Sequence, residues 1–322
     1  MAPGELDEIV GNLTCSDENL LIELDACEDA AVYKIDESRA IIQSVDIITP
    51  VVDDPYYYGQ VAAANSLSDI FAMGAKVLTA MNVVGFDGCN HPRSVLNRML
   101  EGAKSKVEEC GGVTVGGHTI ETPEMLFGLS VTGIADINKI YRNNTPKVGD
   151  VLILTKAIGM GVATTAIKAD MLEENAVKRA VAQMVQLNYK ASIAMQGFDV
   201  SACTDITGFG LLGHSYEMSA NKVTIEFKKD EIPLFKEAID LADMGIIPAG
   251  TYANKSYLAD KVKFVCEEDI LLFDAQTSGG LLIAVSQNDA DKLLRMLISE
   301  GYDSSAIIGE VKEKEDFAIQ VV

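Results

Sequence analysis

The stretch from Tyr57 to Gly74, YYGQVAAANSLSDIFAMG, constrains the fold of this chain more than any other. Its three consecutive alanines are strong helix formers, and the apolar residues after them recur at helical spacing, so we expect a buried helix. Asn65 and Asp69 are four residues apart and therefore share one face of that helix. Because an unpaired carboxylate or amide is costly to bury, both side chains need partners. Two kinds of partner stay open, a metal ion and a hydrogen-bond network in the core.

Length and charge narrow the class of protein. The 322 residues are enough for two domains, and 48% of them are hydrophobic, which allows a sizeable core. The 48 acidic and 26 basic residues give a formal net charge of -22. A field of that sign repels nucleic acid and anionic lipid, so we expect no nucleic-acid partner and no membrane partner. It suits a protein that gathers divalent cations, although solvated acidic surface is the commoner explanation.

The cysteines indicate the compartment. All six are scattered and none forms a C-x-x-C pair, which argues against a zinc ribbon or a disulfide framework. No apolar run is long enough to cross a bilayer, and the acidic N-terminus lacks the core of a signal peptide. We therefore expect a cytoplasmic protein.

A cluster of Asn, Pro and Gly at residues 142–150 marks the expected domain boundary. We place the domains at 1–148 and 149–322. Before the boundary, the pattern predicts a buried strand over 76–86 and an amphipathic helix over 91–111. After it, strand and helix signals alternate, including one long helix over residues 173 to 196.

Carboxylates and glycines in the first half have open interpretations. Asp29 lies in a crowded acidic loop that is either solvated or bridged by a cation. Asp46 is a lone carboxylate in a β-rich run, where it faces either solvent or a site. Over residues 113–137 we expect a strand, a turn at Gly116 and Gly117, and a second strand that is either central in its sheet or at an interface. The alternative for that turn is a tight hairpin without a ligand.

Residues 201–218 contain the second notable stretch. Its glycines spell G-x-G-x-x-G, but a dinucleotide site needs an apolar strand before the motif and a βαβ unit around it. The preceding strand signal is weak, so a Rossmann oxidoreductase is a minor alternative. Asp205 precedes a helix start and is either a helix cap or a metal ligand. His214 is expected to be a partnered core residue. The loop 274–280, DAQTSGG, is typical both of anion-binding turns and of ordinary ones.

Taken together, several segments closely resemble the selenophosphate synthetase (selenide, water dikinase) family. They are EDAAVY, SVDIITPVVDDPYYYGQVAAANSLSDIFAMGAK, GGHTIETPEMLFGLSVTGI, LTKAIGMGVATTA, TDITGFGLLGH and DAQTSGGLL. The likeness runs in order through nearly the whole chain, and the larger group includes aminoimidazole ribonucleotide synthetase. It implies an α/β (α+β) fold of two domains. It also implies a homodimer, in which N-terminal strands of two protomers form a shared β-barrel.

The resemblance also implies a reaction and a site. ATP, selenide and water give selenophosphate, AMP and phosphate, for selenocysteine and selenouridine formation, with Mg²⁺ required and K⁺ commonly needed. The implied metal ligands are Asp29, Asp46, Asp69 and Asp205. The implied nucleotide-binding residues are Ala26, Cys27, Glu28, Asp46, Asn65, Asp69, Gly117, His118 and Thr119. An acidic protein can approach a triphosphate only through bridging cations, which agrees with this assignment.

The sequence departs from the family at its start. The family's Gly-rich segment, with a Cys or selenocysteine and a Lys three residues later, has no counterpart here. Cys15, Cys27 and Lys34 do not match those positions, so no catalytic residue is assigned. Trimming, a UGA codon read as a stop, and natural absence each account for the difference. We expect Mg–ATP binding with impaired selenide-dependent turnover. The alternatives are a non-catalytic Mg–ATP-binding dimer and another phosphotransferase of the same superfamily.

Overall fold

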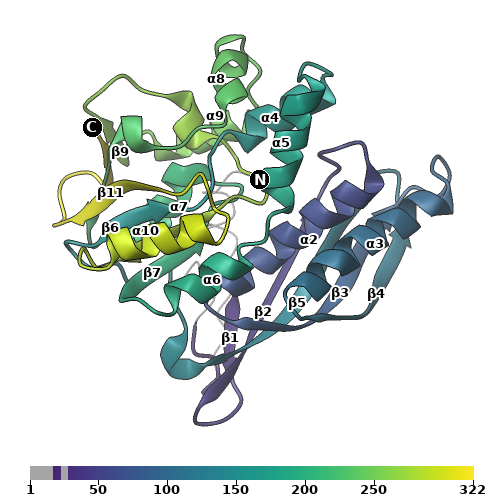
Figure 1. Ribbon diagram of the computed structural model, residues 1–322, viewed down its shortest axis with the longest axis horizontal. Coiled ribbons are helices and arrows are strands. Elements are labelled where there is room, and N and C mark those ends of the chain that lie inside the picture. Colours follow the sequence, from purple (N-terminus) through teal and green to yellow (C-terminus); the bar gives the residue numbers. More distant parts are fainter. Residues whose placement is uncertain (1–16, 23–27) are drawn as a thin grey trace.

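The computed structural model describes residues 17–22 and 28–322 of the chain (Figure 1). The first sheet has five strands in the order β1-β2-β5-β3-β4. These strands are β1 (Ala31–Lys34), β2 (Arg39–Ile48), β3 (Lys76–Phe86), β4 (Val113–Glu121) and β5 (Leu126–Asp136). All neighbours are antiparallel except β3 and β4. The predicted strand at 76–86 and the central position of β5 are confirmed.

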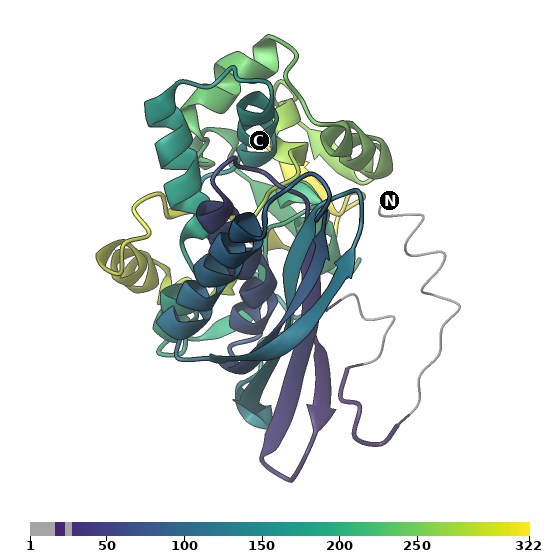
Figure 2. The same cartoon turned by 90° about the vertical axis from the view of Figure 1, so that its right-hand side faces the viewer.

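Helices α2 (Pro55–Ala72) and α3 (Arg93–Glu109) pack on one face of this sheet (Figures 1 and 2). Both confirm the helices expected from the sequence. The Asp54 carboxylate accepts hydrogen bonds from the amides of Tyr56 and Tyr57 and so caps α2. The helices approach closely at Gly59, where a Cβ would lie 2.0 Å from the carbonyl oxygen of Met99. Helix α2 therefore packs against both the sheet and α3, and most of its residues are buried, including Asn65 and Ser68.

Strand β4 corrects the expected glycine turn. The strand runs through Gly116 and Gly117 without reversing, and the chain turns only after Glu121. The pairing with β3 skips Val115, which makes a bulge there, and both glycines have positive φ, at 140° and 153°. A Cβ at Gly117 would lie 2.2 Å from the carbonyl oxygen of Asn82. The glycine pair permits a bulge and a close strand approach, which two adjacent glycines do not distinguish from a turn.

The other face of the first sheet exposes apolar side chains. On β2 the residues alternate, so that Val45 and Ile47 point away from α2 and are 62% and 48% exposed. On β3, Leu78 and Met81 are 39% and 44% exposed. We refer to these four residues as the open face. A group of large apolar side chains on one face of a sheet is typical of an interaction surface.

The second sheet has seven strands in the order β7-β10-β6-β11-β8-β12-β9. They are β6 (Val151–Leu154), β7 (Val200–Asp205), β8 (Thr224–Phe227), β9 (Val262–Phe264), β10 (Leu281–Val285), β11 (Ala306–Lys312) and β12 (Ile319–Val321). The accompanying helices are α4 (Met160–Lys168), α5 (Glu174–Val185), α6 (Tyr189–Met195), α7 (Gly210–Ser219), α8 (Lys236–Asp243), α9 (Ala249–Leu258) and α10 (Ala290–Ser299). Short 3₁₀ helices are Ile137–Lys139, Lys229–Glu231 and Ile270–Phe273. The two sheets lie on either side of residues 142–150, and the boundary at 148/149 stays a prediction.

The single helix expected over residues 173 to 196 is wrong, because the chain forms α5 and α6 there. Gln186 leaves the helix with an extended backbone, at ψ 120°. The Asn188 side chain then donates to the Ser68 hydroxyl and to the carbonyl of Gly279, at 2.8 and 2.9 Å. The break therefore fastens the second domain to α2, which an apolar stripe along the sequence does not reveal.

The glycine motif at 208–213 does not build a dinucleotide site. Strand β7 does precede α7, but β7 lies at the sheet edge and pairs with β10 in the antiparallel sense. The next strand, β8, is four places away, so β7, α7 and β8 form no βαβ unit.

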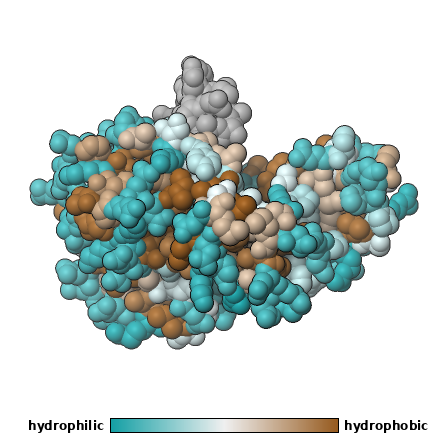
Figure 3. Space-filling view, turned by 90° about the horizontal axis from the view of Figure 1, so that it is seen from above, coloured by the Kyte–Doolittle hydropathy of each residue, from teal (hydrophilic) through white to brown (hydrophobic). Residues whose placement is uncertain are grey.

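The surface seen from above is largely hydrophilic with scattered apolar patches (Figure 3). Across the described parts of the chain, no helix is both long and apolar enough to cross a membrane.

Candidate active site

Four aspartates from distant parts of the chain meet where α2 approaches the edge of the second sheet. Asp29 precedes β1, Asp46 lies on β2, Asp69 on α2, and Asp205 ends β7. The Thr204 hydroxyl donates to Asp29 Oδ1 at 2.7 Å. Asp205, Asp46 and Asp29 all repel the charge of Asp69. We call these four residues the aspartate cluster, and it brings together all four predicted metal ligands.

Burial and mutual repulsion disfavour the charged forms in this cluster. Burial, followed by the negative charge of Asp205, raises the pKa of Asp46 to about 7. The same two causes hold the pKa values of Asp29 and Asp69 well above their ordinary range. Burial also raises the pKa of Asp205, against the opposing effects of His214, Ser68 and Lys156. A bound cation would favour the charged forms of these carboxylates and so offset the effects of burial and repulsion.

Two carboxylate oxygens of the cluster have no hydrogen-bond partner among the described residues. They are Asp29 Oδ2 and Asp205 Oδ2, and both atoms are buried. Within residues 17–22 and 28–322, no three His, Cys, Asp or Glu side chains stand close enough to enclose an ion by themselves. Mg²⁺ typically binds one or two carboxylates and takes its other ligands from phosphate and water. The orphaned oxygens and open arrangement fit such an ion.

The structure shows hydrogen-bond partners for Asn65, for which the sequence left a metal ion or a core network open. Its Nδ2 donates to Asp46 Oδ2 at 2.9 Å, and its Oδ1 accepts from the Ser278 amide at 2.9 Å. This buried amide therefore takes part in a hydrogen-bond network that joins the first sheet to the loop before β10. Its position beside Asp46 agrees with the family resemblance, and its contact with a nucleotide stays a prediction.

The loop 274–280 has its own structural partner. Asp274 Oδ2 accepts from the amides of Gly161 and Val162, at 2.9 and 3.3 Å, at the start of α4. Gln276 Oε1 accepts from the two preceding amides, each at 3.0 Å. Since these donors are already occupied, the first turn of α4 has no free amide here for a bound anion. The side chains of Asp274 and Gln276 therefore have a structural role at the start of α4, and anion binding by the loop's own amides stays a prediction.

Gly117, His118 and Thr119 do not lie beside the aspartate cluster of the same chain. They are exposed on β4, at the sheet edge. Gly117 pairs with Asn82, which faces Leu129, which in turn faces Asp46. Three strand spacings separate the ends of this row, a distance of about 14 Å. Any nucleotide contact by these three residues therefore lies far from the carboxylates of their own chain.

Glu28 is engaged within the protein. Its carboxylate accepts from Arg142 Nε at 2.8 Å and from the Asn143 amide at 2.9 Å. The ion pair ties the start of β1 to the segment between the sheets. Ala26 and Cys27, the other predicted residues of this loop, lie outside the described residues. The nucleotide contact predicted for Glu28 is untested.

Two titratable groups lie near the cluster, and sequence reasoning missed the first of them, Lys156. Lys156 is buried after β6, and burial lowers its pKa to about 7 against the effect of Asp205. His214 is buried and partnered as expected, with Nδ1 3.0 Å from Glu217 Oε2. Burial opposes its charged form, but Glu217, Asp205 and Asp46 outweigh it and raise its pKa. A lysine after a strand resembles a surface residue in sequence, so only the fold reveals its burial.

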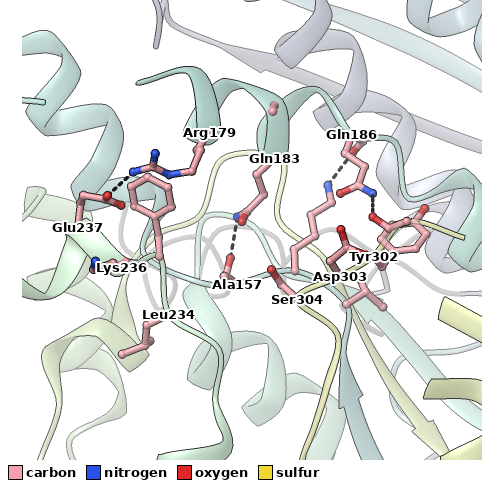
Figure 4. A pocket seen from close by; sticks show the side chains of 15 residues that line it. Ala157, Arg179, Gln183, Gln186, Leu234, Lys236, Glu237, Tyr302, Asp303 and Ser304 are labelled. Carbon is pink, nitrogen blue, oxygen red and sulfur yellow. Dashed lines mark hydrogen bonds and ion pairs between the residues drawn. The ribbon is translucent and has the colours of Figure 1, made fainter. Parts of the chain in front are cut away.

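A cavity of about 530 Å³ lies beside α5, away from the cluster's carboxylates. Figure 4 shows Arg179 facing Glu237 and Gln183 reaching the carbonyl of Ala157, at 2.8 Å for the latter pair. Gln186 Nε2 donates to the carbonyl of Gly301 at 2.9 Å. These three polar side chains of the cavity wall are therefore already paired within the protein.

Comparison with known proteins defines the class. The N-terminal domain model of the AIR synthase related proteins matches residues 27–135, and the C-terminal domain model matches 147–322. The fold is similar to thiamine-monophosphate kinase from Stenotrophomonas maltophilia K279a, with a TM-score of 0.68 and 15% identity over 98% of this chain and 94% of that one. AaThiL, complexed with AMPPCP and TMP, gives a TM-score of 0.70 at 15% identity over 99% and 92%. These proteins share an AIR synthase-like fold of two domains.

Closer relatives identify the branch within that class. Selenide, water dikinase from Aliarcobacter butzleri is 53% identical over 99% of this chain and 94% of its own length. The enzyme of the same name from Caldanaerobacter subterraneus is 51% identical over 100% and 94%. The chain belongs to the selenide, water dikinase family.

Proposed function

We propose that this chain synthesises selenophosphate from ATP, selenide and water and releases AMP and phosphate. Relatives at 53% and 51% identity bear the name of that activity. The observation that carries the proposal is the aspartate cluster, whose mutually repelling carboxylates a bound cation would stabilise in their charged forms. An anionic protein can hold a triphosphate in such a place only through that cation.

In this proposal Asp29, Asp46, Asp69 and Asp205 hold Mg²⁺ and, through it, the phosphates of ATP. The ion supplies neutralisation of the phosphate charge, on which phosphoryl transfer largely depends. Thr204 orients Asp29 by its hydrogen bond, and Asn65 orients Asp46. A K⁺ requirement is proposed on the family resemblance alone.

The proposed homodimer forms through the open face and the edge strand β4. Apolar side chains on that face would leave water on association, which favours binding. Gly117, His118 and Thr119 are exposed and about 14 Å across the sheet from Asp46. We propose that they contact a nucleotide held by the second copy's carboxylates. A cytoplasmic location is proposed from the cysteines, since the four in the described residues are free thiols.

Phosphorus NMR of the products tests this function. The chain is incubated with ATP, Mg²⁺ and selenide, and again without selenide. Selenide-dependent AMP, phosphate and selenophosphate support the proposal. ADP as the nucleotide product points instead to another phosphotransferase of the superfamily. Nucleotide binding without turnover points to a non-catalytic dimer.

A further inference from the structure

Lys156 is a buried amine whose hydrogen-bond partners, among residues 17–22 and 28–322, include no carboxylate. The residue is 2% exposed and lies two positions after the last residue of β6, Leu154. Its ammonium group donates to the carbonyl oxygens of Gln186 at 2.7 Å and Ser278 at 3.0 Å. Burying an ammonium group against neutral carbonyls is costly, and an apolar side chain would fill the space more cheaply. A residue that opposes stability in this way calls for a functional reason.

Ser278, one of the two carbonyl partners of Lys156, is connected to the aspartate cluster by hydrogen bonds. Ser278 accepts from Lys156 through its carbonyl and donates through its amide to Asn65 Oδ1. Asn65 in turn donates to Asp46 Oδ2 at 2.9 Å. The position of the Asp46 carboxylate thus depends on the Ser278 backbone, which Lys156 holds from behind.

Gln186, the other carbonyl partner of Lys156, is connected to the Asp205 side of the cluster. Gln186 is the residue at which the chain leaves α5. Two residues later, Asn188 donates to the Ser68 hydroxyl at 2.8 Å and to the Gly279 carbonyl. Ser68 favours the charged form of Asp205. Through its two hydrogen bonds, Lys156 therefore joins the end of α5 to the turn before β10, near the place where both segments contact α2.

The electrostatic interaction with Asp205 also connects Lys156 to the cluster. The positive charge of Lys156 favours the ionised form of Asp205, and Asp205 favours the charged form of Lys156. The other face of Lys156 lines the cavity beside α5. The lysine thus lines that cavity and also lies near enough to Asp205 for each group to favour the charged form of the other.

We propose that Lys156 is a positioning residue of the cation site, which holds Ser278 and Gln186 so that Asn65 and Ser68 present Asp46 and Asp205 correctly. The inference deepens the proposed function and rests on it for the identity of the ligand. Residues that orient metal ligands typically change metal affinity about 10- to 100-fold when removed. The effect on ion binding should therefore exceed what a loss of packing alone would cause.

The test compares Mn²⁺ binding, followed by electron paramagnetic resonance, in folded variants of the whole chain. Lys156→Met should weaken binding about tenfold or more, and Lys156→Arg should recover part of the loss. Lys178→Met, at an exposed lysine of α5 paired with Glu174, is the matched control and should bind as the parent does. Lys156→Gln, which keeps donors without the charge, replaces the Met variant if that one does not fold. Parental Mn²⁺ affinity in the folded Met or Gln variant overturns the proposal.

Hydrogen exchange separates this inference from the proposed function. In the ligand-free protein, the Ser278 amide, which donates to Asn65, should lose protection in the Lys156 variants and keep it in Lys178→Met. A parent chain that binds no Mn²⁺ would contradict the proposed function. Unchanged protection at Ser278 would contradict the role of Lys156, whatever the metal result.

Discussion

Replacing Asp46 by Asn should stabilise the ligand-free protein while it removes a metal ligand. Burial and the charge of Asp205 raise the pKa of Asp46 from 3.8 to about 7. A shift of that size corresponds to about 4 kcal/mol of unfavourable free energy for the ionised form. Asp46 is partly exposed, so solvent screens its charge, and the neighbouring carboxylates share the unfavourable energy. We therefore expect Asp46→Asn to raise the free energy of unfolding by about 1–3 kcal/mol at neutral pH. Asn can still accept the hydrogen bond from Asn65.

The sign of the pH dependence follows from the raised pKa. Between about pH 4 and pH 7 the folded protein binds more protons at Asp46 than the unfolded chain does. The Asp46 contribution to stability is therefore fully present below pH 4 and is lost as the pH rises through 7. The gain from Asp46→Asn should be largest at pH 8 and clearly smaller at pH 5.

Urea unfolding in EDTA at the two pH values measures this difference. Asp53→Asn, in the exposed loop before α2, is the control and should change stability little at either pH. Added Mg²⁺ should stabilise the parent protein at pH 8 and stabilise Asp46→Asn much less. If Asp46→Asn lowers stability at pH 8 in EDTA, or acts equally at both pH values, the electrostatic reasoning is refuted.

Two further substitutions test the fold and the assembly. Gly59→Ala places a methyl group 2.0 Å from the Met99 carbonyl oxygen between α2 and α3. It should lower the free energy of unfolding by about 1–3 kcal/mol or more in urea, and an unchanged midpoint would contradict this packing. Val45→Glu places a charge on the open face, where Val45 is 62% exposed. It should shift the proposed dimer to monomer in light scattering without lowering the melting temperature of the monomer, and a dimer of parental affinity would exclude this face as the interface.

Much of the first domain could be predicted from the sequence because its elements are long and strongly patterned. Helix α2 and strands β3 and β5 bury apolar residues over many positions, and the pattern follows that burial. Strand β9 has only three residues, too few for a period to show, and it was missed. The break between α5 and α6 was missed because Asn188 bonds to residues far away in sequence.

The aspartate cluster shows the limit of local reasoning more sharply. Thr204 and Asp29 are 175 residues apart, and no local pattern predicts their hydrogen bond. The family resemblance supplied the four aspartates, and the fold then placed them together. Lys156 was missed because its burial depends on Gln186 and Ser278, which are 30 and 122 residues away in sequence. Such tertiary features override the propensities that a sequence displays.

Calorimetric titration of the chain with ATP tests the central claim most directly. We expect ATP to bind in the presence of Mg²⁺ and to bind at least about tenfold more weakly in EDTA. Asp205→Asn, at the buried end of β7, should lose affinity by a similar factor with Mg²⁺ present while it stays folded. Equal ATP affinity with Mg²⁺ and with EDTA, in both proteins, would contradict a cation-bridged triphosphate at these aspartates.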